Sequence, residues 1–136
     1  DRTLSDRLVL VLHIGYAFVP LGFLLCGLAT FDTIASSAGI HAWTAGAMGI
    51  MTLAVMSRAS LGHTGRALVA SPALQAVYAA VLTAALTRIC AVLHSEWSEA
   101  LLYLAAFAWA AAFLGFAYLY APVLCLTRPA KAVSRP

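Results

Sequence analysis

The sequence predicts an all-α, polytopic membrane protein with four transmembrane helices and with both termini in the cytoplasm. The chain of 136 residues is 63% hydrophobic and only 10% charged, with a mean hydropathy of +0.93, whereas soluble domains carry roughly 25% charged residues. Four apolar stretches, at about residues 8–28, 40–57, 72–93 and 100–126, approach or exceed the ~20 residues that span a bilayer. We therefore expect a lipid bilayer around the chain and not a soluble domain.

Charged residues alternate between the two ends of the predicted bundle. Cations precede the first stretch, separate the second from the third and follow the fourth: Arg2, Arg7, Arg58, Arg66, Arg128, Lys131 and Arg135. The two other connections carry acids and no cation: Asp32, Glu96 and Glu99. This asymmetry follows the positive-inside rule and predicts cytoplasmic termini. It also explains the net charge of +3 without nucleic acid as a partner.

The first helix contains Pro20 and Gly22 near its middle. Proline in a helix removes a hydrogen-bond donor and kinks the helix. Such a break is tolerated in a membrane where a neighbouring helix or a cofactor lies alongside. We interpret this one as a packing kink.

The second helix is predicted to begin at an Asp32-Thr33 cap and to run to about residue 61. Ala38, Ala42 and Gly46 recur every four residues, the small-residue spacing that lets two backbones approach closely. This face is expected to meet another helix or a flat ligand.

The third helix has a clear start, because Ser71 suits the N-cap and Pro72 the first helical position. It is predicted to end near Leu93, so Arg88 lies ~7 Å inside the bilayer boundary. An arginine at this depth either faces the bundle interior and pairs with an anion, or extends outward to the interface. The candidate anions are Asp32, Glu96, Glu99 and the carboxylate of a bound cofactor.

The fourth helix carries an aromatic stripe at helical spacing, formed by Trp109, Phe113, Phe116 and Tyr120. We interpret this stripe as a packing face and not as a cofactor site.

The four histidines favour ligation of a metal or haem over hydrolytic catalysis, because no hydrolase, P-loop or Rossmann motif is present. His13 and His63 lie toward the side of the basic loops, whereas His41 and His94 lie toward the other side, with Arg88. His13 and His41 differ in depth by roughly half of the hydrocarbon core, so they cannot clamp one iron. We expect two separate places, or ligands from other helices, and interpret His94 as interfacial.

The segment from Ser57 to Arg66 is predicted to be a loop of defined shape. Arg58 and Arg66 can grip anions such as haem propionates, and two glycines bracket His63-Thr64. Its alternative interpretation is an ordinary basic loop at the cytoplasmic surface.

Two segments resemble the NnrS family: Leu12-His13-Ile14-Gly15-Tyr16, and the run from His41 to Arg66, HAWTAGAMGIMTLAVMSRASLGHTGR. The most specific part of the likeness is residues 51–66. NnrS proteins are polytopic bacterial inner-membrane proteins associated with haem, with copper, and with the response to nitric oxide and nitrosative stress during denitrification. The resemblance implies that residues 1–136 form one four-helix module, the last part of a larger protein. It also implies that His13, His41 and His63 are the metal-binding residues.

The resemblance further implies that Arg58 and Arg66 contact the cofactor, and Arg88 fits this role less closely. The sequence thus predicts a haem-binding and copper-binding inner-membrane protein whose small ligand is nitric oxide or a related molecule. Its partners would be the remaining helices of the parent protein or further copies of the chain. The alternatives are a transporter or channel module, with Arg88 and the glycines of the second helix lining a path, and a purely structural bundle.

Overall fold

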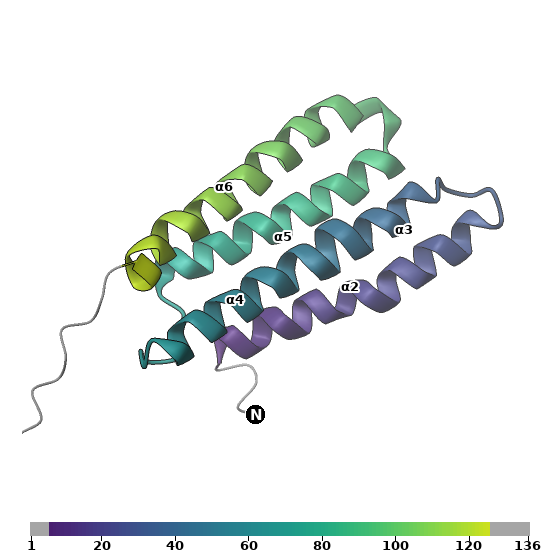
Figure 1. Cartoon of the computed structure of the whole chain (residues 1–136). Coiled ribbons are helices and arrows are strands. Elements are labelled where there is room, and N and C mark those ends of the chain that lie inside the picture. Colours follow the sequence, from purple (N-terminus) through teal and green to yellow (C-terminus); the bar gives the residue numbers. More distant parts are fainter. Residues whose placement is uncertain (1–5, 126–136) are drawn as a thin grey trace, which may run out of the picture.

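The computed structural model describes residues 6–125, and every regular element in that part is a helix (Figure 1). Four helical segments are long and apolar enough to cross a membrane: Arg7–Ala29, Ser37–His63, Pro72–Leu93 and Ser95–Cys125. The predicted fold class and the four predicted spans are therefore confirmed. The predicted end of the fourth span at residue 126 and the cations Arg2, Arg128, Lys131 and Arg135 lie outside the described residues.

Two of the four spans are built from more than one element. The first span is α2 (Arg7–Ala29) and the third is α5 (Pro72–Leu93). The second span joins α3 (Ser37–His41), the π-helical segment η1 (Ala42–Met48) and α4 (Gly49–His63). The fourth joins the short 3-10 helix η2 (Ser95–Trp97) to α6 (Ser98–Cys125).

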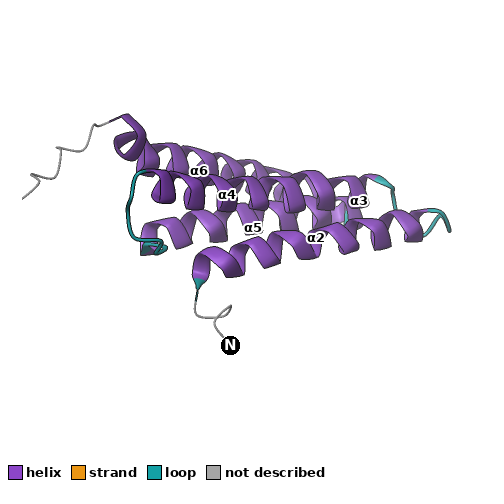
Figure 2. Ribbon diagram, turned by 60° about the horizontal axis from the view of Figure 1, so that its bottom comes forward, coloured by secondary structure: helices purple, strands orange, loops and turns teal. Residues whose placement is uncertain are grey.

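The spans lie side by side in the order α2, second span, α5 and α6, with neighbours antiparallel (Figures 1 and 2). α2 packs on all three parts of the second span, and α5 packs on the second span and on α6. In the most apolar 18-residue stretch of the second span, 50% is buried inside the bundle. In the corresponding stretch of the fourth span, 17% is buried. The second span is thus central, whereas α6 presents most of its surface outward.

The charged groups mark the two ends of this bundle. We call the end that carries Arg7, Arg58 and Arg66 the basic end, and the end that carries Asp32 and the two glutamates near the start of α6 the acidic end. The beginning of α2 and the end of α6 lie together at the basic end (Figure 1). That this end faces the cytoplasm stays a prediction of the positive-inside rule.

Close packing between α2 and the second span depends on a tryptophan. Trp43 of η1 donates a hydrogen bond from Nε1 to the Val19 carbonyl at 3.0 Å. Gly22 makes room for the indole, because a Cβ there would lie 2.1 Å from Trp43 Nε1. Pro20 lies inside α2, which continues to Ala29. One side chain of the second span therefore fills the space that the middle of α2 leaves open.

The small residues of the second span also meet α2. Ala38 and Ala42 are fully buried, and a Cβ on Gly46 would lie 2.2 Å from Phe18 Cδ1. The predicted contact between this face and another helix is confirmed.

The start of the second span differs from the prediction. Asp32 is not its N-cap, because the Asp32 N–H bonds to the Ala29 carbonyl at 3.2 Å and so continues the turn that ends α2. Asp32 has a φ of 53°, a left-handed conformation that aspartate tolerates better than most residues. The helix begins at Ser37, with Ser36 in the N-cap position.

The end of the second span lies two residues beyond the predicted end at about residue 61, and Ser57–His63, also predicted as part of a loop, is helical. The helix ends in a Schellman motif: Arg66 N–H bonds to the Leu61 carbonyl at 2.9 Å and Gly65 N–H to the Gly62 carbonyl at 3.1 Å. Gly65 has a φ of 61°, which favours glycine. The segment does have a defined shape, as predicted, but this shape is the C-terminal end of a helix.

The start of α5 agrees with the prediction. The Ser71 side chain accepts a hydrogen bond from Leu74 N–H at 3.2 Å, and Pro72 is the first helical residue. In α6, Phe116 and Tyr120 are buried and stack with ring centroids 4.4 Å apart. This half of the aromatic stripe is the packing face that the sequence indicates.

Candidate cofactor cavity

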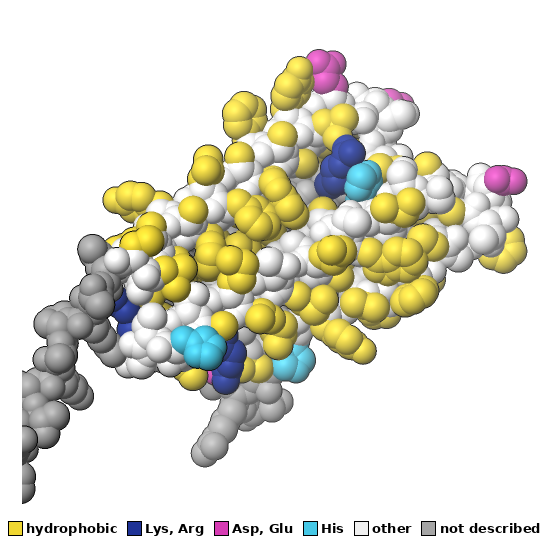
Figure 3. Space-filling view, in the orientation of Figure 1, with side chains coloured by type: hydrophobic (Ala, Val, Ile, Leu, Met, Phe, Trp, Pro, Cys, Tyr) yellow, Lys and Arg dark blue, Asp and Glu magenta, His cyan; other side chains and the backbone are white. Residues whose placement is uncertain are grey.

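The largest recess described lies between the second span, α5 and α6 on the acidic-end half of the bundle. Its volume is about 510 Å³, within the roughly 300–1,000 Å³ typical of small-molecule and cofactor sites. The residues that line it are His41, Thr44, Ala45, Ala84, Arg88, Leu102, Ala105, Ala106 and Trp109. Figure 3 shows a histidine and a basic side chain side by side among hydrophobic side chains on this face. We call this recess the His41 cavity.

The polar groups of the cavity come from two different spans at one depth. His41 lies ~6 Å along the second span from its start, and Arg88 lies ~7 Å before the end of α5, both measured from the acidic end. The predicted grouping of these two residues on one side of the membrane is therefore confirmed. Both side chains are partly exposed to the cavity.

Neither His41 nor Arg88 has a side-chain hydrogen bond or ion pair within residues 6–125. An unpaired guanidinium within a membrane span is costly and normally faces an anion. None of the predicted acidic partners supplies one, because the ion pair found in the described part joins Arg58 to Asp6. The cavity thus presents an imidazole and a guanidinium that make no side-chain hydrogen bond or ion pair with the described residues.

The walls of the His41 cavity are small and apolar. Four alanines from three spans line the cavity with methyl side chains: Ala45, Ala84, Ala105 and Ala106. Trp109 also lines the recess, and its ring packs on the second span, since a Cβ on Gly49 would lie 2.7 Å from it. Such walls suit a flat, apolar molecule.

The chemistry of these lining residues is compatible with haem. The imidazole of His41 is a common iron ligand, the guanidinium of Arg88 matches a propionate carboxylate, and the alanine walls match a planar macrocycle. Among the described residues, His41 is the one iron ligand that lines the cavity.

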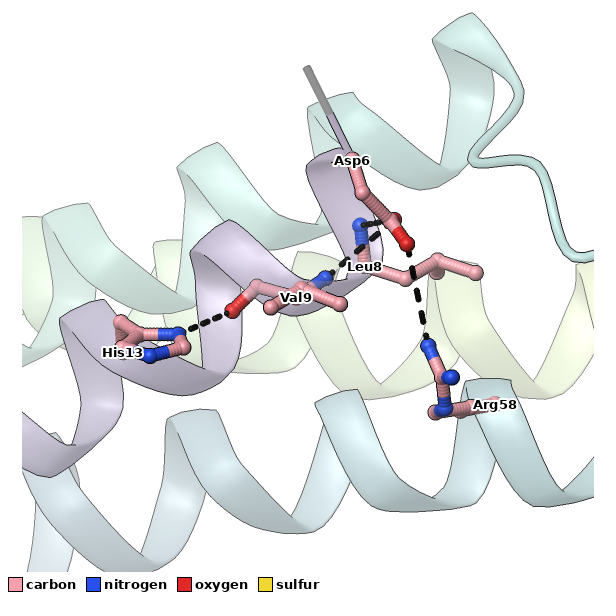
Figure 4. A network of polar contacts seen from close by, with 5 residues as sticks. All are labelled: Asp6, Leu8, Val9, His13 and Arg58. Carbon is pink, nitrogen blue, oxygen red and sulfur yellow. Dashed lines mark hydrogen bonds and ion pairs between the residues drawn. The ribbon is translucent and has the colours of Figure 1, made fainter. Parts of the chain in front are cut away.

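His13 lies far from this cavity, on the first turns of α2 near the basic end. Its ring Nδ1 is 2.9 Å from the Val9 carbonyl of its own helix, and the side chain is exposed (Figure 4). On the same turns, Asp6 accepts hydrogen bonds from Leu8 and Val9 N–H and pairs with Arg58 at 3.9 Å. This network caps α2 and fastens it to α4.

His63 and Arg66 are exposed at the end of the second span. The structure therefore places His13 and His63 apart from His41, in line with the depth argument. Within residues 6–125, no three His, Cys, Asp or Glu side chains gather closely enough to hold a metal ion. The described residues thus do not fit a copper site built from three such ligands.

The fourth histidine lines a separate recess of about 350 Å³, together with Cys90, Trp97 and Leu101. His94 is exposed there at the end of α5. This location agrees with its interpretation as an interfacial residue.

The transport alternative requires Arg88 and the glycines of the second helix to line one path. Arg88 lines the cavity, but these glycines do not. Gly39 and Gly46 of the second span face Cys26 and Phe18 of α2, and Gly49 faces Trp109. No glycine lines the His41 cavity. Gly39, Gly46 and Gly49 of the second span therefore serve helix packing.

Sequence reasoning missed two residues of the site. Trp109 was assigned to packing alone, and Thr44 was not singled out. The spacing of His41, Thr44 and Ala45 on one helical face could have indicated Thr44. Nothing comparable marks Trp109, which reaches the cavity only through the way α6 packs.

Comparison with known proteins gives one family. The NnrS protein family matches residues 1–128 of the chain. No curated protein matches the chain, and no solved structure matches it. The likeness covers all four spans and includes His41 and Arg88. The chain is a multi-pass membrane protein that belongs to the NnrS family.

Proposed function

We propose that this NnrS-family protein binds haem in the His41 cavity and acts in the bacterial inner membrane in the response to nitric oxide and nitrosative stress. Membership of the family is consistent with a membrane protein of the nitric oxide response. The observation that carries the haem proposal is the pairing of His41 with Arg88 in one cavity of about 510 Å³, where neither has another partner among the described residues.

Each residue has a distinct part in this proposal. His41 holds the iron through a ring nitrogen, and Arg88 neutralises a propionate carboxylate at the acidic end. The alanines and Trp109 exclude water from the macrocycle, which favours binding of an apolar plate. Bound haem would supply an iron centre that takes up nitric oxide. Sensing, buffering and electron transfer are all compatible with such a centre.

Copper is the second cofactor implied by the family resemblance. It stays a prediction, since the described residues offer no cluster of three ligands. Arg58 lies 3.9 Å from Asp6, and both side chains are partly exposed, so its predicted contact with a cofactor stays a prediction.

Visible absorption of the purified protein tests the haem proposal. The full chain, produced with haem supplied and isolated in mild detergent, is expected to show a Soret band that shifts when nitric oxide is added to the reduced form. His41→Ala should remove the band, while His63→Ala and His94→Ala should keep it. Arg88→Gln should weaken haem affinity roughly 10- to 150-fold, because a hydrogen bond to a charged group contributes ~1.5–3 kcal/mol.

The variants also define failure. A Soret band that survives His41→Ala and disappears in His63→Ala would place the iron at the basic end. Absence of haem from the wild-type chain and from the larger natural protein would end the proposal. Flux of an anion through liposomes without any chromophore, lost in Arg88→Gln, would favour the transport alternative.

A further inference from the structure

A second recess opens on the basic-end half of the bundle, between α2 and α5 over the middle of the second span. Its residues are Arg7, Leu10, Val11, Ile14, Ile50, Gln75, Tyr78, Ala79 and Leu82. Leu10, Val11 and Ile14 form one wall on α2, and Ile50 is the one residue of the second span that lines it. We call it the Arg7 groove. It is independent of the His41 cavity, with which it shares no residue.

The Arg7 groove reaches from the first residue of α2 to about the middle of α5. On α2 it runs from Arg7, the first helical residue, to Ile14, ~10 Å deeper. On α5 it runs to Leu82, ~15 Å from the helix start at Pro72. Half of the hydrocarbon core measures ~15 Å. The groove therefore extends from the interface to about the middle of the bilayer.

The size of the groove selects its occupant. Its volume is about 160 Å³, below the roughly 300–1,000 Å³ of cofactor sites. Apart from Arg7 and Gln75 its lining is aliphatic or aromatic. A narrow apolar channel of this length accommodates part of a hydrocarbon chain and not a macrocycle.

The charge at the mouth of the groove is positive. Arg7 has no ion pair within residues 6–125. The nearest acid in sequence, Asp6, already accepts from two backbone N–H groups and pairs with Arg58. Gln75 donates from Nε2 to the Ala70 carbonyl at 3.0 Å, which holds its amide near the interface. A cation at the interfacial end of an apolar groove complements a lipid phosphate.

We propose that the Arg7 groove binds an anionic phospholipid of the leaflet at the basic end. One acyl chain lies along Leu10, Ile14 and Leu82, and the phosphate contacts the Arg7 guanidinium. Basic pockets between transmembrane helices recognise anionic lipid head groups in this way. The site does not depend on haem binding.

Native mass spectrometry of the full chain tests this assignment. Protein in mild detergent is titrated with phosphatidylglycerol and, separately, with phosphatidylcholine of the same acyl chains. We expect the wild type to retain phosphatidylglycerol preferentially. Arg7→Gln should lower this retention about fivefold, which corresponds to the ~1 kcal/mol contributed by one cation near the surface. Arg66→Gln, which changes another basic-end cation outside the groove, should have little effect.

A second pair of variants tests whether the groove binds an acyl chain, without changing the charge of the protein. Ala79→Phe fills the groove and should reduce retention of both lipids, whereas Ala76→Phe, on an exposed part of α5 outside the groove, should not. Equal losses in Arg7→Gln and Arg66→Gln would reveal a diffuse charge effect and overturn the proposal. Unchanged retention in Ala79→Phe would overturn it too. A dimer that Ala79→Phe dissociates, with no lipid bound, would assign the groove to a second copy instead.

Discussion

Replacing Gly22 with alanine probes the contact between α2 and the second span at its tightest point. A Cβ on Gly22 would lie 2.1 Å from Nε1 of the Trp43 indole and 2.3 Å from Cδ1. Ordinary van der Waals contact begins at 3.4 Å. The rigid indole must therefore move by roughly 1 Å, a displacement that also stretches its hydrogen bond to the Val19 carbonyl.

The expected cost combines three contributions. Overpacking costs ~1–3 kcal/mol, and weakening of the Trp43 hydrogen bond costs ~0.5–1.5 kcal/mol. Alanine gains ~0.5–1 kcal/mol over glycine in a helix interior. We expect Gly22→Ala to lower the free energy of unfolding by about 2 kcal/mol. The matched change Gly27→Ala, in the same helix with nothing within 4 Å of its Cβ, should be neutral or stabilising by ~0.5–1 kcal/mol.

Unfolding by a denaturing detergent in mixed micelles, followed by tryptophan fluorescence and circular dichroism, measures both variants. The fluorescence of Trp43 should change in Gly22→Ala and stay unchanged in Gly27→Ala. Equal stabilities of the two variants would show that the indole does not sit on Gly22 and would refute the described packing of α2.

Two further predictions concern helix ends. Gly65→Ala should destabilise the chain by about 1 kcal/mol because Gly65 has a φ of 61°. Gly62→Ala is the control and should not destabilise it, since Gly62 is helical with open space at its Cβ. Thermal unfolding compares the two variants, and equal midpoints would contradict the Schellman assignment. Ser71→Ala should lower the free energy of unfolding by ~1 kcal/mol, because it removes the hydrogen bond that caps Leu74 N–H. Ser36→Ala serves as the control, since the Ser36 side chain makes no cap bond. Loss of stability in Ser36→Ala alone would overturn this reasoning.

Much of the fold could be predicted because a bilayer leaves the backbone few choices. A segment in hydrocarbon must satisfy its own N–H and C=O groups, so long apolar runs become helices. Local signals such as Ser71-Pro72 then set a boundary correctly. Asp32 misled the prediction because its side chain suits an N-cap, whereas the turn after α2 uses it in a left-handed conformation. Local chemistry alone does not distinguish the two roles.

The end of the second helix was predicted within two residues, at about residue 61, whereas the loop expected from Ser57 overlaps this helix. Arg58 and His63 suggested a loop because they are polar, yet the helix continues to His63. The π-helical segment η1 was not predicted either. It lies where Trp43 inserts against α2, and π-helical turns often occur at functional sites. Both features depend on contacts with other parts of the chain, which the sequence alone does not display.

The candidate site was partly predictable from depth. Counting residues from the helix ends placed His41 and Arg88 at one level, and the structure brings them to one cavity. The resemblance to the family names His13, His41 and His63 as metal-binding, which stays a prediction, and the structure places His13 and His63 apart from His41 as the depth argument expects. Trp109 could not be assigned to the site from the sequence, because its contact with the cavity depends on how α6 packs against the second span and α5.

The His41 cavity divides its contacts between two helical hairpins. α2 and the second span form one hairpin, α5 and α6 form the other, and residues 64–71 join them. His41 belongs to the first and Arg88 to the second, so an occupant that touches both acts as a clasp across the join. Such an occupant favours the assembled state by about 2.7 kcal/mol when its concentration is 100 times Kd. Because α5 already packs on all three parts of the second span, such an occupant would add to an interface that the two hairpins form by themselves.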